Sequence, residues 1–221
     1  MSDRVLKVGG LHFNGKDQYV MVNGSIPLTN GVTIALWLKY QYTGKYQNPI
    51  NIYSGNALAP SWGMGASFYI DTYGRFYWCL FDGQNPFMYP SLILTENTWY
   101  HLLCTQYGSD IKIYVNGELR DRSDNFTGVL CAPGPTHIGR RYTTYGLSKG
   151  LIDKVLVYNR ALSPEEAQAV YEGREPLKGL LLHLPLTEYE GNTVYDKSGN
   201  NNHGTIYGAK WAIKKEVRGG S

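Results

Sequence analysis

Apolar and polar side chains alternate along much of this chain, and this alternation limits the folds it can adopt. Ile34, Leu36 and Leu38 would lie on one face of an extended segment, with Ala35 and Trp37 on the other. A period of two residues predicts a β-strand, because successive side chains point to opposite faces. Further strands are predicted at residues 68–70, 75–81, 100–106, 111–115, 151–158 and 180–184. We therefore expect an all-β protein.

Turn signals separate the predicted strands. The stretch Tyr107-Gly108-Ser109-Asp110 predicts a turn, and Asn116-Gly117 predicts a hairpin, because both of these last residues tolerate a positive φ. Many short strands with such turns favour an antiparallel sandwich over alternating strands and helices. The length of 221 residues is enough for one large sandwich.

One short helix is predicted at residues 164–172. Ser163 can act as its N-cap, Pro164 suits the first helical position, and Glu166 completes a capping box. Gly173 is a natural residue to end it. We interpret this helix as a structural element on the surface.

Composition narrows the classes of function. The chain has 19 Tyr, 5 Trp and 26 Gly, which suits many strands joined by glycine-containing turns. The net charge is only +3, and basic residues are scattered, so we expect no nucleic-acid partner. No segment approaches the roughly 18 to 20 apolar residues of a membrane span, so we expect no membrane insertion.

The three cysteines, Cys79, Cys104 and Cys131, cannot all pair within one chain. They lack the close spacing of a metal cluster. We interpret Cys79 and Cys104 as small apolar residues on strands. A disulfide between them stays open as an alternative if the protein is extracellular.

Several motifs occur in an order and spacing that suggest a family. Residues 11–20 read LHFNGKDQYV, residues 33–38 read TIALWL, and residues 150–163 end in YNRALS directly before the predicted helix. Together with residues 179–205, they resemble laminin-G-like domains of the concanavalin-A-like lectin and glucanase type. The resemblance covers about residues 9–213. It implies an antiparallel two-sheet jelly-roll β-sandwich with one short surface helix.

The order of these motifs is rotated relative to that family. Residues 179–213 resemble the family's first strand and loop, but here they follow the rest of the domain. This order indicates a circular permutation or a segment cut out of phase from a tandem array. We predict one domain at residues 1–218, closed by its own terminal segment, with 219–221 a linker remnant. A domain-swapped chain, or the severed start of a next repeat, is the alternative.

The loop at residues 196–204 is rich in oxygen-bearing side chains. Calcium prefers six to eight oxygen ligands, and Asp196, Asn200 and Asn202 can supply some of them. The resemblance implies a structural Ca²⁺ site completed by groups such as Asp153 or Asn14. The alternative is a polar turn in which Asp196 and Asn200 cap backbone amides.

Aromatic residues beside polar ones suggest a glycan site, because sugar rings stack on aromatic faces. The candidate contacts are Trp62, Trp78, Phe87 and Tyr89, from the stretches 56–64 and 82–89. The wider group of aromatic candidates includes Tyr69 and Tyr145. The alternative is that most of these aromatics form core or cross-strand pairs.

No catalytic constellation is recognisable. Glucanases with this sandwich use closely spaced carboxylates on one strand, of the type E-x-D-x-x-E, and this chain has no such motif. We therefore expect a non-catalytic binding module, carbohydrate-binding or adhesive, of an extracellular or cell-surface protein. Its partner would be a glycan or a surface protein. The alternative is a structural repeat of an array, filament or virion that associates with its neighbours and binds no small ligand.

Overall fold

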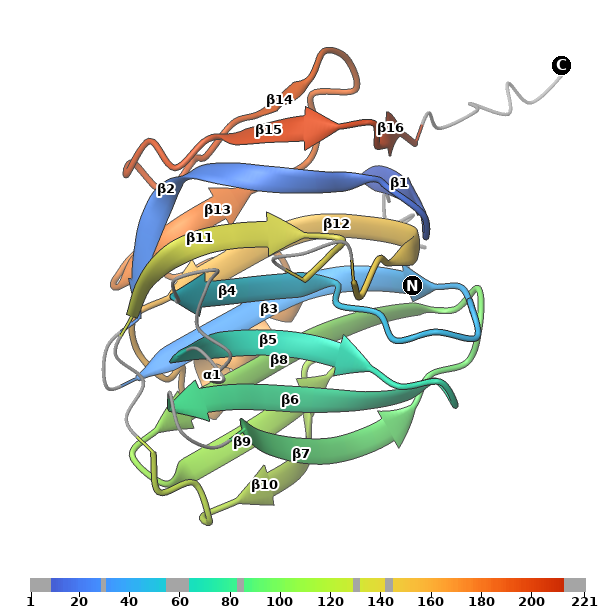
Figure 1. Ribbon diagram of the computed structural model, residues 1–221. Helices are drawn as coiled ribbons and strands as arrows, with labels where there is room; N and C mark the ends of the chain where they lie inside the picture. Colours follow the sequence, from blue (N-terminus) through green and yellow to red (C-terminus); the bar gives the residue numbers. More distant parts are fainter. Residues whose placement is uncertain are drawn as a thin grey trace, which may run out of the picture.

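Two antiparallel sheets form the protein. The computed structural model describes residues 9–28, 31–54, 64–82, 86–128, 132–141 and 145–212. Sheet A has the order β10 (Glu118–Ser123), β9 (Asp110–Val115), β8 (Trp99–Tyr107), β3 (Val32–Tyr40), β12 (Lys149–Tyr158), β1 (Leu11–Asn14), β16 (Lys210–Trp211), with β13 (Leu180–Leu184) also paired to β12. Sheet B has the order β14 (Thr193–Val194), β15 (Gly204–Tyr207), β2 (Tyr19–Leu28), β11 (Ala132–Ile138), β4 (Ile50–Ser54), β5 (Met64–Ile70), β6 (Arg75–Asp82), β7 (Pro86–Ile93). Figure 1 looks onto sheet B, with sheet A behind it.

The strands predicted from alternation lie within β3, β5, β6, β8, β9, β12 and β13. The predicted hairpin is confirmed: β9 and β10 are joined at Asn116 and Gly117, whose φ angles are 52° and 87°. Residues 86–89 of the stretch 82–89 form the start of β7, which begins at Pro86. Proline has no N–H to donate, and an edge strand such as β7 tolerates it.

The helix α1 (Pro164–Tyr171) forms as predicted. The Ser163 Oγ accepts a hydrogen bond from Glu166 N at 3.2 Å, and Ser163 N donates to Glu166 Oε2 at 2.9 Å. Ala167 and Val170 pack against Leu103, Leu156 and their buried neighbours on the outer face of sheet A. The helix lies behind both sheets in the view of Figure 1, so it does not cover the outer face of sheet B.

The core lies between the inner faces of the two sheets. On β5, Ala66, Phe68 and Ile70 point inward, and on β6 Phe76, Trp78 and Leu80 do so. Their alternate neighbours point to the outer face of sheet B. This alternation positions the site described below.

The C-terminal segment contributes strands to both sheets. Residues of β13 pair with Val155 to Tyr158, while β1 pairs with Lys149 to Ile152, so the two strands lie end to end along β12. On sheet B, β15 pairs with β2. Leu182, Leu184 and Val194 are fully buried in the shared core. The terminal segment therefore contributes β13 and β16 to sheet A and β14 and β15 to sheet B.

Candidate binding pocket on sheet B

A row of outward-facing side chains crosses the outer face of sheet B. The register pairs Asn51 with Ser67, Ser67 with Cys79, and Cys79 with Met88 across β4, β5, β6 and β7. His137 of β11 extends this row, because it pairs with Asn51. The row mixes small, polar and apolar groups and forms the floor of a pocket at Ser67, Cys79 and Met88.

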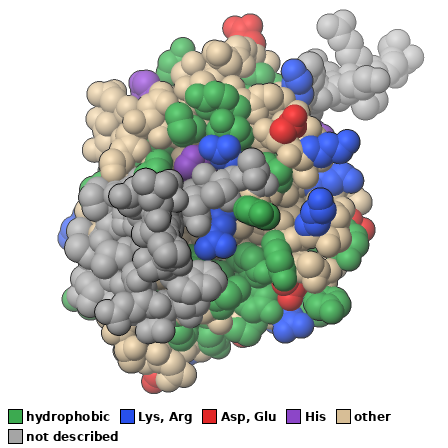
Figure 2. Space-filling model, viewed as in Figure 1, with side chains coloured by type: hydrophobic (Ala, Val, Ile, Leu, Met, Phe, Trp, Pro, Cys, Tyr) green, Lys and Arg blue, Asp and Glu red, His purple; other side chains and the backbone are tan. Residues whose placement is uncertain are grey.

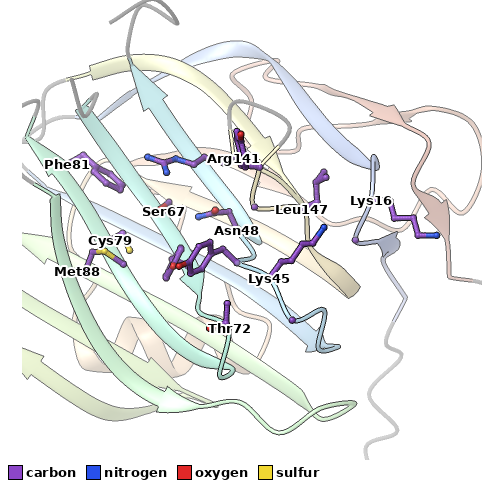
Figure 3. A pocket seen from close by; sticks show the side chains of 16 residues that line it. Lys16, Lys45, Asn48, Ser67, Thr72, Cys79, Phe81, Met88, Arg141 and Leu147 are labelled. Atoms are coloured by element: carbon purple, nitrogen blue, oxygen red, sulfur yellow. The ribbon is translucent and has the colours of Figure 1, made fainter. Parts of the chain in front are cut away.

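The pocket above this floor has a volume of about 900 Å³. Its walls come from the loops at residues 44–48 and 145–147 and from the β1–β2 turn (Figure 3). Asn48 N donates to Gly146 O at 2.7 Å, which fastens the first two loops together. Gly146 has φ +68°, and a Cβ there would lie 2.2 Å from Asn48 Oδ1. Glycine is therefore required where these loops meet.

Three tyrosines and Phe81 form the aromatic part of the pocket. Tyr46 and Tyr145 are 56% and 75% exposed. Tyr46 stacks on Tyr69, with ring centroids 5.5 Å apart and an interplanar angle of 29°. Burial raises the pKa of Tyr69, so its hydroxyl stays protonated at neutral pH. These rings offer flat apolar faces next to hydroxyl groups.

Polar groups beside the rings can bind hydroxyls. Asn48 donates through Nδ2 to Phe68 O at 3.0 Å, which fixes the orientation of its carboxamide. Burial raises the pKa of the Cys79 thiol, so it stays protonated and is neither a nucleophile nor a metal ligand at neutral pH. Farther along the row, Asn51 Nδ2 and His137 Nδ1 are buried without a hydrogen-bond partner. Buried polar atoms normally have partners, so these atoms can still pair with a ligand or with water.

Of the aromatic contacts predicted from sequence, Trp78, Phe87 and Tyr89 are not among the residues that line this pocket. Trp78 is 0% exposed, because alternation along β6 places it in the core with Phe76 and Leu80. Phe87 and Tyr89 are half-buried against the core, on the side of β7 opposite Met88. Trp62 lies outside the described residues. The interpretation of Trp78 as a surface contact is therefore corrected to a core residue.

The loop at residues 196–204 is organised by hydrogen bonds to one carboxylate. Asp196 accepts from the backbone N of His183, Ser198 and Asn202, each at 2.9 Å, and from Ser198 Oγ at 2.7 Å. Burial disfavours the charged form of Asp196, but these hydrogen bonds outweigh it and hold its pKa below the usual value. Asn200 and Asn202 donate through Nδ2 to backbone carbonyls of β13. This arrangement is that of the polar turn for Asp196, whereas Asn200 donates to carbonyls instead of capping backbone amides.

The other candidate calcium ligands lie elsewhere. Asp153 is on β12, where burial raises its pKa to about 6. Asn14 pairs with Lys149, which lies four residues before Asp153 on β12. Four strand residues span about 13 Å, so Asn14 and Asp153 are well separated. Within the described ranges, no three His, Cys, Asp or Glu side chains are grouped to hold a metal ion. As arranged, these residues do not fit a calcium site, and the ion stays a sequence-based prediction.

Replacing Asp196 by Ala is expected to destabilise the fold by about 3 kcal/mol, because four donors lose a charged acceptor. The wild-type melting temperature is expected to be the same in millimolar calcium and in EDTA. Urea denaturation and thermal melting measure both effects, with the exposed Asp17→Ala as the control. A bound ion would stabilise the folded state by mass action, so a higher midpoint in calcium would contradict this account of the loop.

Cys79 and Cys104 are free and buried. Cys79 lies on the outer face of sheet B, and Cys104 lies in the core on sheet A. The disulfide alternative is therefore wrong for this pair. Cys131 lies outside the described residues.

Comparisons with known proteins agree with this architecture. Residues 14–168 match a family model of the concanavalin A-like lectin/glucanases superfamily. The chain belongs to this superfamily. A search of curated proteins finds no match to the sequence. In the part of the chain that the structure describes, no helix is long and apolar enough to cross a membrane.

Solved structures share this superfamily fold at low sequence identity. One is a Bacteroides ovatus protein to which carbohydrate binding has been ascribed, with TM-score 0.70 and 19% identity over 94% of this chain; the match spans 60% of that protein. A heptameric pentraxin from Limulus polyphemus matches with TM-score 0.63 and 14% identity over 93% of this chain and 95% of its own. Mouse laminin α1 domains LG4–5 match with TM-score 0.54 and 14% identity over 72% of this chain and 45% of theirs.

Proposed function

We propose that this domain is a non-catalytic carbohydrate-binding module whose site is the pocket on the outer face of sheet B. The observation that supports this most directly is the pocket itself, about 900 Å³ in volume, with exposed Tyr46 and Tyr145 in its walls. Ligand sites are typically concave, apolar and furnished with a few polar groups. Tyrosine faces can stack on sugar rings, while Asn48, Ser67 and Thr72 can bind hydroxyls.

The lining supports binding over hydrolysis. Glycoside hydrolysis commonly uses two carboxyl groups that flank the scissile bond. Among the described residues that line the pocket, none is Asp or Glu. We therefore assign the pocket to recognition alone. In this proposal the module serves a surface or extracellular protein, and its partner is a glycan.

The test is a glycan screen of the purified protein together with Tyr145→Ala. Both proteins are expected to fold equally well, because Tyr145 is 75% exposed, and the variant is expected to bind about tenfold more weakly. Tyr107→Ala is the matched control, because Tyr107 is 63% exposed and lies at the β8–β9 turn of sheet A. Absence of glycan binding by folded protein would contradict the proposal and favour a structural repeat. Equal losses in both variants would contradict the assignment to this pocket.

A further inference from the structure

We infer that the saccharide recognised by this pocket is anionic, carrying a carboxylate or a sulfate group. This inference rests on the proposed function and names the class of ligand. Lys16, Lys45 and Arg141 all line the pocket, and no described lining residue is acidic. Three cations around one concave surface attract and orient a negatively charged ligand.

The cations come from three separate segments. Lys16 lies in the β1–β2 turn, Lys45 lies in the loop between β3 and β4, and Arg141 follows β11. In Figure 3, Arg141 extends toward Phe81, whereas Lys45 and Lys16 lie at the other end of the pocket. The Arg141 guanidinium carbon is 6.0 Å from the centre of the Phe81 ring. The positive charges therefore flank the pocket at both ends, and a ligand lying in it would pass between them.

Nearby carboxylates do not neutralise the two lysines. The ion pairs found among the described residues include neither Lys16 nor Lys45. Asp17 accepts a hydrogen bond from Asn14 at 2.8 Å. Asp71, next to the lining residue Thr72, accepts from the backbone N of Tyr73 and Arg75 at 2.9 Å and pairs with the Arg75 side chain. The lysine charges are therefore available to a ligand.

The size and lining of the pocket favour a saccharide over a small inorganic anion. A volume of about 900 Å³ is at the upper end of the range for organic-ligand sites. Phosphate or sulfate alone offers no apolar surface to the exposed rings of Tyr46 and Tyr145. A sugar ring supplies the apolar surface for these faces, and its charged substituent supplies the partner for the cations. Figure 2 shows Lys and Arg side chains beside hydrophobic ones on this face of the molecule.

Isothermal titration with matched oligosaccharides tests this inference. The ligands are a uronic-acid oligosaccharide, its carboxyl-reduced neutral counterpart, and a sulfated oligosaccharide of the same length. The protein is expected to bind at least one acidic ligand about tenfold more tightly than the neutral one, with an affinity that falls as salt is raised. The two acidic ligands distinguish carboxylate from sulfate recognition.

Charge-removing variants assign the effect to the pocket. Lys16→Gln combined with Lys45→Gln, and separately Arg141→Gln, are each expected to weaken acidic-ligand binding about tenfold and to weaken neutral-ligand binding much less. Arg141→Lys should restore part of the loss, because it keeps the charge. Lys210→Gln is the matched control, since it removes one exposed charge on sheet A.

Two outcomes would overturn the inference, and they are distinguishable. Equal affinities for the acidic and reduced ligands would overturn it and leave the proposed carbohydrate site in place. Binding of none of the three, by a protein that also fails the glycan screen, would overturn the proposed function as well.

Discussion

Removing residues 179–221 is expected to abolish cooperative folding. The deletion takes away the buried side chains of β13 to β15, including Leu182, Leu184, Val194 and Ile206, and also Leu186. Burying each such side chain contributes about 1.5 to 3 kcal/mol, so the loss is on the order of 10 kcal/mol. Native domains are stable by only about 5 to 15 kcal/mol. Circular dichroism and thermal melting of the truncated chain measure the result, and a melting transition like that of the full chain would contradict it.

Moving the segment instead of deleting it is the matched control. Ala212 N donates to Gly10 O at 2.9 Å, and Leu11 pairs with Trp211, so the end of β16 lies beside the start of β1. A chain that begins at Gly179 and joins Ala212 to Gly9 through a short Gly-Ser linker should therefore fold and melt near the wild type. Its new termini break only the connection between α1 and β13. Failure of this permuted chain to fold would mean that the segment needs its present connection.

Acid is expected to destabilise the protein through His101. This side chain is buried between Trp37 and Tyr171, at ring-centroid distances of 5.2 and 5.6 Å. Burial, together with the nearby charge of Lys154, lowers its pKa from 6.5 to about 3. The unfolded chain takes up a proton near pH 6.5, whereas the folded chain does not until about pH 3. Stability is therefore complete above pH 6.5 and is lost as the pH falls toward 3.

The expected loss through this group is about 2.5 kcal/mol between about pH 7.5 and about pH 4.5. His101→Phe keeps an aromatic ring in the same space and removes the titration. Between about pH 7.5 and about pH 4.5, this variant should therefore lose about 2.5 kcal/mol less stability than the wild type. Urea denaturation at several pH values measures the difference. The exposed His12→Phe is the control and should follow the wild type. The same pH dependence in wild type and His101→Phe would refute the assignment to His101.

Alternation in the sequence was sufficient to predict strands such as β3, β6 and β12, because burial imposes a two-residue period on them. The same alternation indicates that Trp78 faces the core. Phe76, Trp78 and Leu80 lie on one face of the strand, and Arg75, Tyr77 and Cys79 lie on the other. Trp78 was interpreted as a surface contact because its ring can stack on a sugar, although the alternation indicated a buried position. The β7 strand was harder to predict, because Gly83, Asn85 and Pro86 resemble a turn.

The pocket could not be predicted in the same way. Lys16, Lys45 and Arg141 are far apart in sequence, and only Lys16 belongs to a motif, at residues 11–20. They line one pocket because the β1–β2 turn, the loop between β3 and β4 and the segment after β11 all border it (Figure 3). The only available signals were Tyr69 and Tyr145, which belonged to the wider group of aromatic candidates. Topology and register, and not local pattern, determine which polar residues share a site.

The most direct test of the central claim is amide chemical-shift mapping of labelled protein with an oligosaccharide selected by the screen. We expect the largest shifts at residues 45–48, 67, 79 and 145–148, around the pocket on sheet B. Residues 196–202 should shift little, because that loop is satisfied by its own hydrogen bonds. Shifts concentrated at residues 196–202, or at the outer face of sheet A under α1, would contradict the assignment of the binding site.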